Sequence, residues 1–268
     1  MRIPFAQIDA FADQPFAGNP AAVMPLADWL DDATLQAIAA ENNLSETAFI
    51  IPDASGAANF ELRWFTPAAE VALCGHATLA SGHFVLQSEP DRASVTFRTR
   101  QAGVLEVRRD GMNYALALPA WPPAPRDLAA VARTLGVASP VETLWHDKGY
   151  SLLVADSAAV VRALDPSPAD LATLERQVAV VTAPGDPESR SDIVSRVFTP
   201  GYGIHEDPVT GSAHAVSVPY WARRLGRNRF TALQASPRGG RLTCELRGDQ
   251  VVLGGACVTV IEGTFLLP

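Results

Sequence analysis

The sequence is poor in cysteine and lacks a cluster of basic residues. Only three of its 268 residues are cysteines. So small and odd a number predicts no disulfide framework and favours a reducing compartment, so we expect a cytoplasmic protein. Lysine and arginine together number 21 against 29 aspartates and glutamates, which gives a net charge of −8. A chain with this charge is poorly suited to bind nucleic acid or an anionic membrane.

Signatures of membranes and cofactors are also missing. No apolar run reaches the roughly 18 residues of a membrane-spanning helix. Asp9 and Asp13 lie where a signal peptide would be apolar. There is no zinc-ligand spacing, no glycine-rich dinucleotide motif and no phosphate-binding loop, so we expect neither a cofactor nor a metal. Hydrophobic residues make up 48% of the chain, enough for one large core or two smaller ones.

Alternation of apolar and polar residues predicts many short strands and few helices. The predicted strands cover residues 3–11, 46–51, 59–65, 94–97, 103–109, 113–118, 152–155, 178–182, 192–198, 242–247, 250–254 and 257–262. The predicted helices cover residues 32–43, 75–86, 128–135, 169–176 and 211–225. Helices 75–86 and 211–225 are apolar on nearly every side, which is typical of buried helices. The fold class is therefore α+β, dominated by antiparallel strands.

A repeated motif indicates that the chain consists of two similar halves. The letters RWFTP at residues 63–67 return as RVFTP at residues 196–200, a step of 133 that also joins Cys74 to Asp207. A chance match is the alternative, but the equal spacing to a loop that feeds an apolar helix argues against it. We predict halves 1–120 and 121–268, each a curved sheet around one helix, with the last strand allowed to cross back. The boundary should lie in the proline-rich residues 119–125, which cannot continue a strand ladder.

The loop before the first buried helix contains Cys74, Gly75 and His76. The first amides of a helix have no internal partner, and with the helix dipole they attract an anion. Gly75 lets a ligand approach the backbone, and His76 is suited to donate to a carboxylate or to relay a proton. The alternative is a buried helix start with a structural histidine.

The matching loop of the second half leads into Thr210, Gly211 and Ser212, again with small residues at a helix start. By the step of 133, Asp207 occupies the place of Cys74. If the halves pack about a pseudo-twofold axis, both helix starts face one cleft. We expect that cleft to hold a small carboxylate between main-chain amides.

Glu46 stands at the start of an apolar strand, flanked by Ser45 and Thr47. A carboxylate that loses water to apolar walls is suited to proton transfer near neutral pH. The alternative is a solvated glutamate on an edge strand. Asn19 follows a tight turn, where its amide would contact a ligand or hold the turn.

The halves do not carry a pair of matching thiols, because Asp207 stands where a second cysteine would be. A single acid/base, Glu46, favours proton transfer between two positions on one face of a substrate over inversion of a carbon. Cys244 and Cys257 fall in predicted strands and are more typical of core residues.

Four blocks of residues resemble the phenazine-biosynthesis PhzF-like family, whose fold is that of diaminopimelate epimerase. They are Asp-Ala-Phe with Phe-Ala-Gly-Asn-Pro-Ala-Ala-Val in 9–23, Asn-Leu-Ser-Glu-Thr-Ala-Phe at 43–49, Phe-Thr-Pro to Cys-Gly-His-Ala-Thr in 65–78, and Glu-Asp-Pro-Val-Thr-Gly-Ser at 206–212. The resemblance implies two domains of one fold, each a barrel-like sheet around a central helix, with the active site between them. It also implies a homodimer and a cofactor-independent isomerase. In the founding member, a glutamate moves a proton within trans-2,3-dihydro-3-hydroxyanthranilate.

The resemblance assigns roles to residues of this chain. It implies that Glu46 moves the proton, with His76 and Asp207 as further catalytic residues. Substrate-binding positions are predicted at Asn19, Ser45, Cys74, Gly75, Gly211 and Ser212. Cys74 is similar to the epimerase branch, so an amino-acid epimerase that uses Cys74 is one alternative. A metabolite-binding protein of the same fold without turnover is another.

Overall fold

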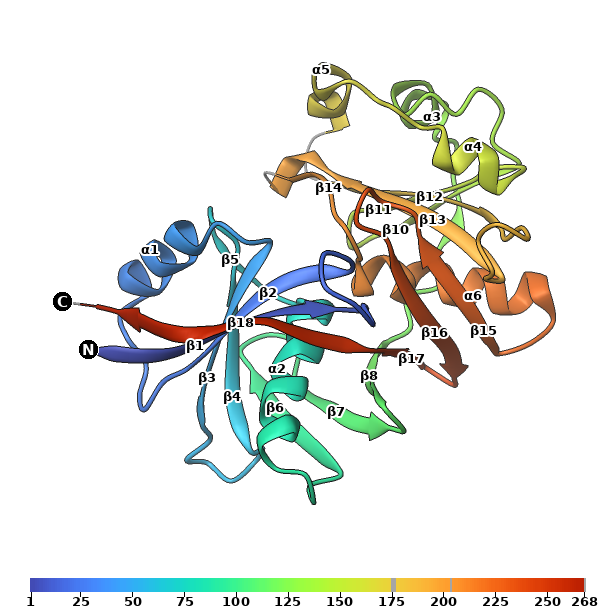
Figure 1. Ribbon diagram of the computed structural model, residues 1–268. Coiled ribbons are helices and arrows are strands. Elements are labelled where there is room, and N and C mark those ends of the chain that lie inside the picture. Colours follow the sequence, from blue (N-terminus) through green and yellow to red (C-terminus); the bar gives the residue numbers. More distant parts are fainter. Residues whose placement is uncertain (175–176, 203, 268) are drawn as a thin grey trace. The chain divides into compact units, whose positions relative to one another are not determined.

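The computed structural model describes residues 1–174, 177–202 and 204–267 (Figure 1). The chain divides into two compact units. Unit 1 comprises Met1–Ala117 and Gly254–Pro268, and unit 2 comprises Leu118–Leu253. The chain leaves unit 1 within strand β8 (Asn113–Pro119) and returns within β17 (Gln250–Gly255).

Unit 1 is built on one mixed sheet. Its other strands are β1 (Arg2–Ala10), β2 (Asn19–Pro25), β3 (Glu46–Pro52), β4 (Phe60–Phe65), β5 (Glu70–Val71), β6 (Ser94–Thr99), β7 (Val104–Asp110) and β18 (Cys257–Leu266). They pair in the order β18–β1–β2–β3–β4–β6–β7–β8, and β5 also pairs with β4. The pairs β2–β3 and β4–β6 are parallel, and the others are antiparallel.

Two helices accompany the sheet of unit 1, α1 (Asp32–Asn42) and α2 (Gly75–Ser88). Helix α2 packs against β1, β2, β3, β6 and β7, and eleven of its residues are buried, which confirms the predicted buried helix. Gly82 makes this packing possible. A Cβ atom on Gly82 would lie 2.3 Å from Cγ1 of Val107 in β7, so only glycine fits there without displacing the strand.

Unit 2 contains the remaining elements. Its strands are β9 (Ala124–Pro125), β10 (Glu142–His146), β11 (Tyr150–Val154), β12 (Val178–Pro184), β13 (Ile193–Thr199), β14 (Ile204–Glu206), β15 (Arg229–Gln234) and β16 (Gly240–Arg247). Its helices are α3 (Ala129–Thr134), α4 (Ala158–Arg162), α5 (Pro168–Leu171) and α6 (Gly211–Leu225), with 3₁₀ turns at Ala172–Leu174 and Pro200–Tyr202. The pairing order is β9–β10–β11–β12–β13–β15–β16, and β14 also pairs with β13.

The two units repeat one topology. In unit 1, β3 is parallel to β2 and antiparallel to β4, and β4 is parallel to β6. In unit 2, β12 is parallel to β11 and antiparallel to β13, and β13 is parallel to β15. In each unit a short strand, β5 or β14, leads into the buried helix. The α+β class with two related halves is therefore confirmed.

An ion pair is repeated with the topology. Nε of Arg63 donates to Oε1 of Glu70 at 2.8 Å, and Nε of Arg196 donates to Oε1 of Glu206 at 2.7 Å. Each guanidinium also lies over the phenylalanine two residues later in its strand, at 4.9 Å and 5.2 Å from the ring centroid. The RxFTP motif thus ties the strand before each buried helix to the loop that enters it.

Two predictions about unit 2 are wrong. The helix predicted at 169–176 is one short turn, Pro168–Leu171, followed by a 3₁₀ turn at Ala172–Leu174, and residues 175–176 lie outside the described part. Pro168 fixes its start, and the segment is too short to continue as an α-helix. The second wrong prediction is that residues 119–125 cannot take part in a strand ladder. Within this stretch, Ala124 pairs with Trp145 and Pro125 pairs with Leu144. A two-residue edge strand tolerates a proline that lacks a donor.

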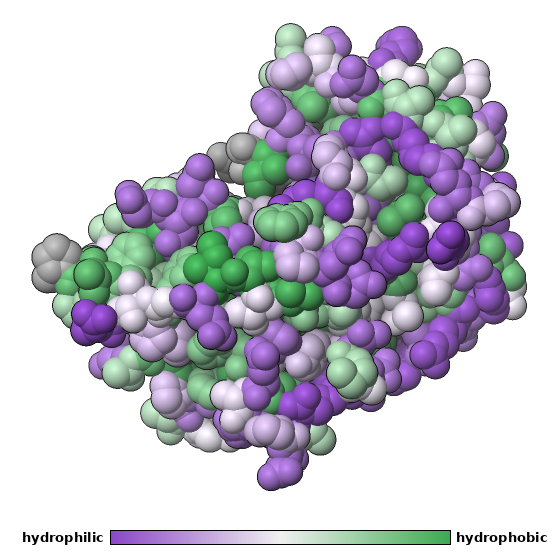
Figure 2. All heavy atoms as spheres, in the orientation of Figure 1, coloured by the Kyte–Doolittle hydropathy of each residue, from purple (hydrophilic) through white to green (hydrophobic). Residues whose placement is uncertain are grey.

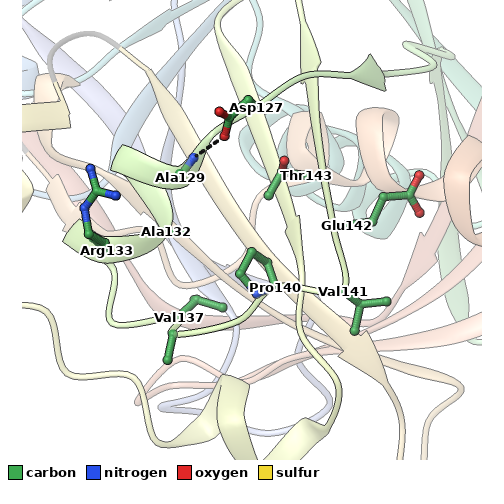
Figure 3. A pocket seen from close by; sticks show the side chains of 10 residues that line it. Asp127, Ala129, Ala132, Arg133, Val137, Pro140, Val141, Glu142 and Thr143 are labelled. Atoms are coloured by element: carbon green, nitrogen blue, oxygen red, sulfur yellow. Dashed lines mark hydrogen bonds between the residues drawn. The ribbon is translucent and has the colours of Figure 1, made fainter.

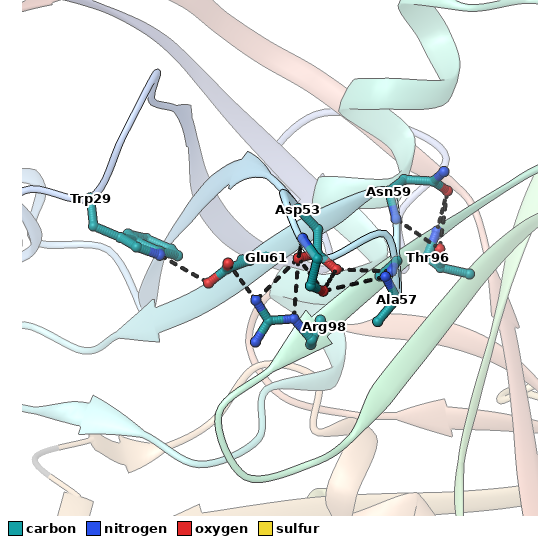
Figure 4. A network of polar contacts seen from close by, with 9 residues as sticks. Trp29, Asp53, Ala57, Asn59, Glu61, Thr96 and Arg98 are labelled. Carbon is teal, nitrogen blue, oxygen red and sulfur yellow. Dashed lines mark hydrogen bonds and ion pairs between the residues drawn. The ribbon is translucent and has the colours of Figure 1, made fainter.

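A polar network closes the turn between β3 and β4 (Figure 4). The carboxylate of Asp53 accepts from the amides of Ser55 and Ala58 at 3.0 and 2.9 Å. Arg98 of β6 donates to Asp53 at 3.1 Å and also to Glu61, which accepts from Nε1 of Trp29. These bonds to Arg98 hold the pKa of Asp53 well below its usual value. The network joins the turn after β3 to β4, β6 and the segment before α1.

Apolar side chains of β18 reach the surface of unit 1. Ile261 and Leu266 are 50% and 65% exposed, and Figure 2 shows hydrophobic atoms along this strand. Among the described residues, no helix is both long and apolar enough to span a membrane.

Candidate active site

Glu46 is held at the first position of a central strand. Helix α1 ends at Asn42 and is followed by its C-cap Asn43, whose left-handed backbone (φ 46°, ψ 39°) turns the chain toward β3. Strand β3 pairs with β2 on one side, where Glu46 faces Ala21, and with β4 on the other. The side chain of Glu46 is 14% exposed, so it is not the solvated edge-strand residue of the alternative interpretation.

The start of α2 presents the second group of residues. Cys74 is the N-cap, with extended backbone and no side-chain capping bond, and Gly75 and His76 are the first two helical residues. Thr78 donates its amide to the carbonyl of Cys74. The amides of Gly75, His76 and Ala77 precede this first internal bond, so they have no partner within the helix.

His76 joins these groups into one cluster. Its Nε2 atom lies 2.9 Å from Oε2 of Glu46. Its Nδ1 atom lies 3.1 Å from Nδ2 of Asn19 and 3.5 Å from Sγ of Cys74. Nε2 of His76 and Oε2 of Glu46 are buried, and within the described part of the chain neither has a hydrogen bond of good geometry. The structure thus brings together Asn19, Glu46, Cys74 and His76, with Ser45 and Gly75 adjacent in the chain.

Burial and charge act on the cluster together. Burial, with a further contribution from the charge of Glu46, raises the pKa of the Cys74 thiol to about 11. Burial lowers the pKa of His76, whereas a negative charge on Cys74 or on Glu46 raises it. Cys74 is a thiol at neutral pH, so the largest of the raising contributions is absent there and only the charge of Glu46 opposes the effect of burial.

The same three side chains could be considered as metal ligands. Ligand atoms of Glu46, Cys74 and His76 all lie within 4.8 Å of one another. Thiolate, imidazole and carboxylate are the ligands of zinc. However, Nδ1 of His76 faces Cys74 while Nε2 faces Glu46. A single metal ion binds only one nitrogen of the His76 ring. As the side chains are placed, an ion on that nitrogen would have either Cys74 or Glu46 as its second ligand.

The predicted residues of the second loop lie at the start of α6 in unit 2. Thr210 is its N-cap, without a side-chain capping bond, and Gly211 and Ser212 are its first two residues. The hydroxyl of Thr210 donates to Oδ2 of Asp207, which is 8% exposed. This loop is therefore ordered by contacts within unit 2.

Gln234 holds the loop of residues 207–210 through two hydrogen bonds to its backbone. The sequence did not predict this role. Gln234 is fully buried at the end of β15, where Nε2 donates to the carbonyl of Asp207 at 2.7 Å. Its Oε1 accepts the amide of Thr210 at 2.9 Å. No strand was predicted at 229–234, so nothing in the sequence marked Gln234 as buried.

The prediction that Asp207 matches Cys74 is wrong. Counted from the paired glutamates, Glu70 and Glu206, the helices begin five residues later in both units. Thr210 is therefore the counterpart of Cys74. The turn between the Phe-Thr-Pro motif and the glutamate is three residues longer in unit 2, which a constant step of 133 cannot show. The absence of a second thiol at the matching place still holds, because Thr210 has none.

A separate hollow of about 500 Å³ lies between α3 and β10 in unit 2 (Figure 3). Its walls include Asp127, Arg133 and Glu142 among apolar residues. Asp127 accepts the amide of Ala129, and Glu142 accepts from the hydroxyl of Tyr220. The charged ends of Arg133 and Glu142 point apart in Figure 3, so the hollow lacks a convergent set of reactive groups.

Comparisons with known proteins agree with this description. The family model PhzC-PhzF, described as phenazine biosynthesis-like protein, matches residues 8–263. An uncharacterized isomerase of Pseudomonas aeruginosa is 46% identical over 268 residues and covers 100% of both chains. A PhzF-family crystal structure from Enterococcus faecalis has a TM-score of 0.90 at 39% identity, again covering 100% of both chains. A hydroxyproline epimerase from Agrobacterium vitis shares the fold, with a TM-score of 0.62, 11% identity and coverage of 98% and 92%.

Proposed function

Because the chain belongs to the PhzC-PhzF family of phenazine biosynthesis-like proteins, we propose that it is an isomerase that moves a proton within a small carboxylate substrate. The observation that carries this proposal is the contact of 2.9 Å between Glu46 and His76. General acid–base catalysis needs a carboxylate and a proton relay held within reach of one another. The His76 side chain is buried and that of Glu46 is 14% exposed, and each keeps a buried polar atom without an aligned hydrogen bond.

In this proposal Glu46 takes a proton from a carbon next to a carboxylate or conjugated system and returns it to another carbon. The pair with His76 allows the proton to be shared while the substrate is an anion. The amides of Gly75 and His76, which have no partner within the helix, stabilise the negative charge that develops on the substrate. This sequence of steps needs no cofactor, because moving a proton between two carbons changes neither the composition nor the oxidation level of the substrate.

We also propose that Asp207 and the amides of Gly211 and Ser212 serve the same reaction. Asp207 is nearly buried and accepts from Thr210, which holds its carboxylate in one orientation. The α6 helix begins with small residues, as α2 does. Asp207→Asn tests this step, and it should reduce turnover while thermal unfolding stays unchanged.

The central experiment is proton exchange in deuterium oxide. A panel of cyclic diene acids, including trans-2,3-dihydro-3-hydroxyanthranilate, and of α-amino acids is incubated with the protein and followed by NMR and mass spectrometry. We expect isomerisation of a carboxylate of the first kind. Glu46→Gln should lower turnover about 10²- to 10⁴-fold while substrate binding remains. Glu41→Gln, at an exposed position of α1, is the matched control. Wild-type turnover by Glu46→Gln would refute the assignment.

An amino-acid epimerase is the second candidate, favoured by the position of Cys74 beside His76. That reaction would exchange the α-hydrogen of an amino acid, and Cys74→Ala would abolish the exchange. The high pKa of the thiol and the threonine at the matching position both weigh against it. Binding of a metabolite with no exchange at any carbon would instead indicate a protein that binds without turnover.

A further inference from the structure

We propose that Asn19 and Cys74 are positioning residues that keep Nδ1 of His76 unprotonated, so that the ring carries its proton on Nε2, facing Glu46. The consequence for catalysis depends on the proposed function, whereas the placement of the proton does not. Both residues were predicted to bind substrate. The contacts in unit 1 give them a different task.

The first observation is the chemistry of the atoms around Nδ1. Nδ2 of Asn19 lies 3.1 Å away, and an amide nitrogen can only donate. The ring nitrogen that it meets must therefore offer a lone pair. Sγ of Cys74 lies 3.5 Å from the same atom. As a thiol it also donates, so two donors converge on Nδ1 and oppose a proton there.

The second observation concerns the opposite edge of the ring. Nε2 lies 2.9 Å from a carboxylate oxygen of Glu46, and a negative charge at that distance stabilises a proton between the two atoms. Asn19 and Cys74 exclude the proton from one nitrogen while Glu46 retains it on the other. The ring can then pass that proton only on the side of Glu46.

The third observation is that Asn19 is held rigidly and out of reach of solvent. It has no exposed surface and begins β2, where it pairs with Ala10. Gly18 before it has a φ of +65°, and a Cβ atom there would lie 2.2 Å from the carbonyl oxygen of Ala10. Only glycine permits this approach, which sets Asn19 at the start of the strand. A residue buried in this way is placed to orient His76.

The test is nitrogen NMR of protein labelled with ¹⁵N-histidine, without substrate. The His76 signals are assigned by their loss in His76→Gln. We expect Nδ1 of His76 to show the shift of an unprotonated nitrogen and Nε2 that of a protonated one. His214 supplies an internal reference of the opposite kind, because its Nδ1 lies 2.8 Å from the carbonyl of Thr210 and must donate. A proton on Nδ1 of His76, alone or together with one on Nε2, would overturn the proposal.

Variants extend the test. Asn19→Asp replaces the donor by an acceptor and should move the proton to Nδ1, with a loss of kcat that exceeds any change in KM. Asn228→Asp, at an exposed position of unit 2, makes the same chemical change outside unit 1 and should leave the His76 spectrum unchanged. An unshifted spectrum in folded Asn19→Asp would contradict the proposal. If Asn19→Asp does not fold, Cys74→Ala removes the second donor, and the wild-type spectrum alone still decides. If His76 has the expected protonation but Glu46→Gln keeps full turnover, the proposed function fails and this inference stands.

Discussion

Cys74 and Thr210 hold the same position in the two units. Each is the N-cap of its unit's buried helix, with φ and ψ of −139° and 109° for Cys74 and −115° and 102° for Thr210. Neither side chain caps its helix. Thr210 turns its hydroxyl to Asp207, whereas Cys74 lies beside His76. The same backbone position therefore supports different chemistry in the two units.

This relationship leads to a prediction about thiol reactivity. Burial and the charge of Glu46 raise the pKa of Cys74 to about 11, and burial raises that of Cys257 to about 12 and that of Cys244 further. At pH 8 only about a thousandth of Cys74 would be thiolate, which is the reactive form. We expect iodoacetamide to leave the native protein almost unlabelled at pH 8 and to label all three cysteines in denaturant.

Glu46→Gln provides a control for the cause of the low reactivity. Removing the neighbouring charge should lower the pKa of Cys74 and speed its labelling, as measured by peptide mass spectrometry. Cys244 and Cys257 should be unaffected. Rapid labelling of Cys74 in the native wild type would show that the thiol is activated and would favour epimerase chemistry.

Local patterns in the sequence were sufficient to predict the fold class and most strands. The buried helices were predicted because residues 75–86 and 211–225 lack a polar face. The alignment of Asp207 with Cys74 failed because three extra residues in one turn do not change the motifs on either side. Helix α4 was missed because its five residues are too few for a clear period, and strand β15 was also missed.

Local motifs also predicted part of the candidate site, but not the contacts between its residues. Glu46, Cys74 and His76 lie in distinct motifs, but the contact between Asn19 and His76 joins residues 57 positions apart. Pairing of β2 with β3 and packing of α2 against both produce that contact. Gln234 acts through a strand that the sequence did not reveal. Contacts of this kind arise from tertiary structure and leave no local periodicity.

Gly82→Ala should destabilise unit 1. A Cβ atom there would lie 2.3 to 2.8 Å from three side-chain atoms of Val107, which is fully buried. Overpacking costs about 1–3 kcal/mol and should exceed the gain of about 1 kcal/mol that alanine brings to a helix. Urea unfolding should show the loss. Gly263→Ala, where a Cβ meets nothing within 4 Å, is the matched control.

Combining Gly82→Ala with Val107→Ala provides a test of the mechanism. Val107→Ala alone should destabilise the protein, because it leaves a cavity at β7. In the double variant the new Cβ fills part of that cavity, so the total loss should be smaller than the sum of the two single losses. Additive losses would show that Gly82 acts through backbone flexibility.

His83 should make stability depend on pH. Burial, with the nearby charge of Arg109, lowers its pKa to about 4, while Nε2 lies 3.0 Å from the Thr259 hydroxyl. The unfolded chain binds a proton below about pH 6.5, and the folded chain does so only below about 4. His83 therefore contributes fully to stability above pH 6.5, and this contribution is lost as the pH falls toward 4.

Unfolding in urea between pH 7 and 4 measures this effect. His83→Gln should flatten the decline in the free energy of unfolding by about 2–3 kcal/mol over that range. His205→Gln changes an exposed side chain and should keep the wild-type slope. A His83→Gln variant with the wild-type slope would show that His83 titrates alike in both states.

Gln234→Leu should destabilise unit 2 by about 2–4 kcal/mol, because two buried backbone groups at Asp207 and Thr210 would lose their partners. It should also reduce turnover, since Asp207 would no longer be held in place. Gln250→Leu, at an exposed position, is the control for the change in chemistry. Two other bonds also hold this loop: the Ser236 hydroxyl donates to the carbonyl of Pro208 at 2.9 Å, and the Thr210 hydroxyl donates to Asp207. Unchanged stability in Gln234→Leu would mean that these bonds suffice without Gln234.

Metal analysis tests whether Glu46, Cys74 and His76 act as ligands. The two ring nitrogens of His76 face Cys74 and Glu46 separately, so the arrangement gives one ion at most two of these ligands at a time. Stable zinc sites use three or four protein ligands. We expect far less than one zinc per chain after purification without chelators, and unchanged turnover after treatment with EDTA. One zinc per chain, removed by EDTA together with activity and restored by zinc, would contradict this. Loss of that zinc in both Cys74→Ala and His76→Gln, but not in Glu41→Gln, would then identify the cluster as its site.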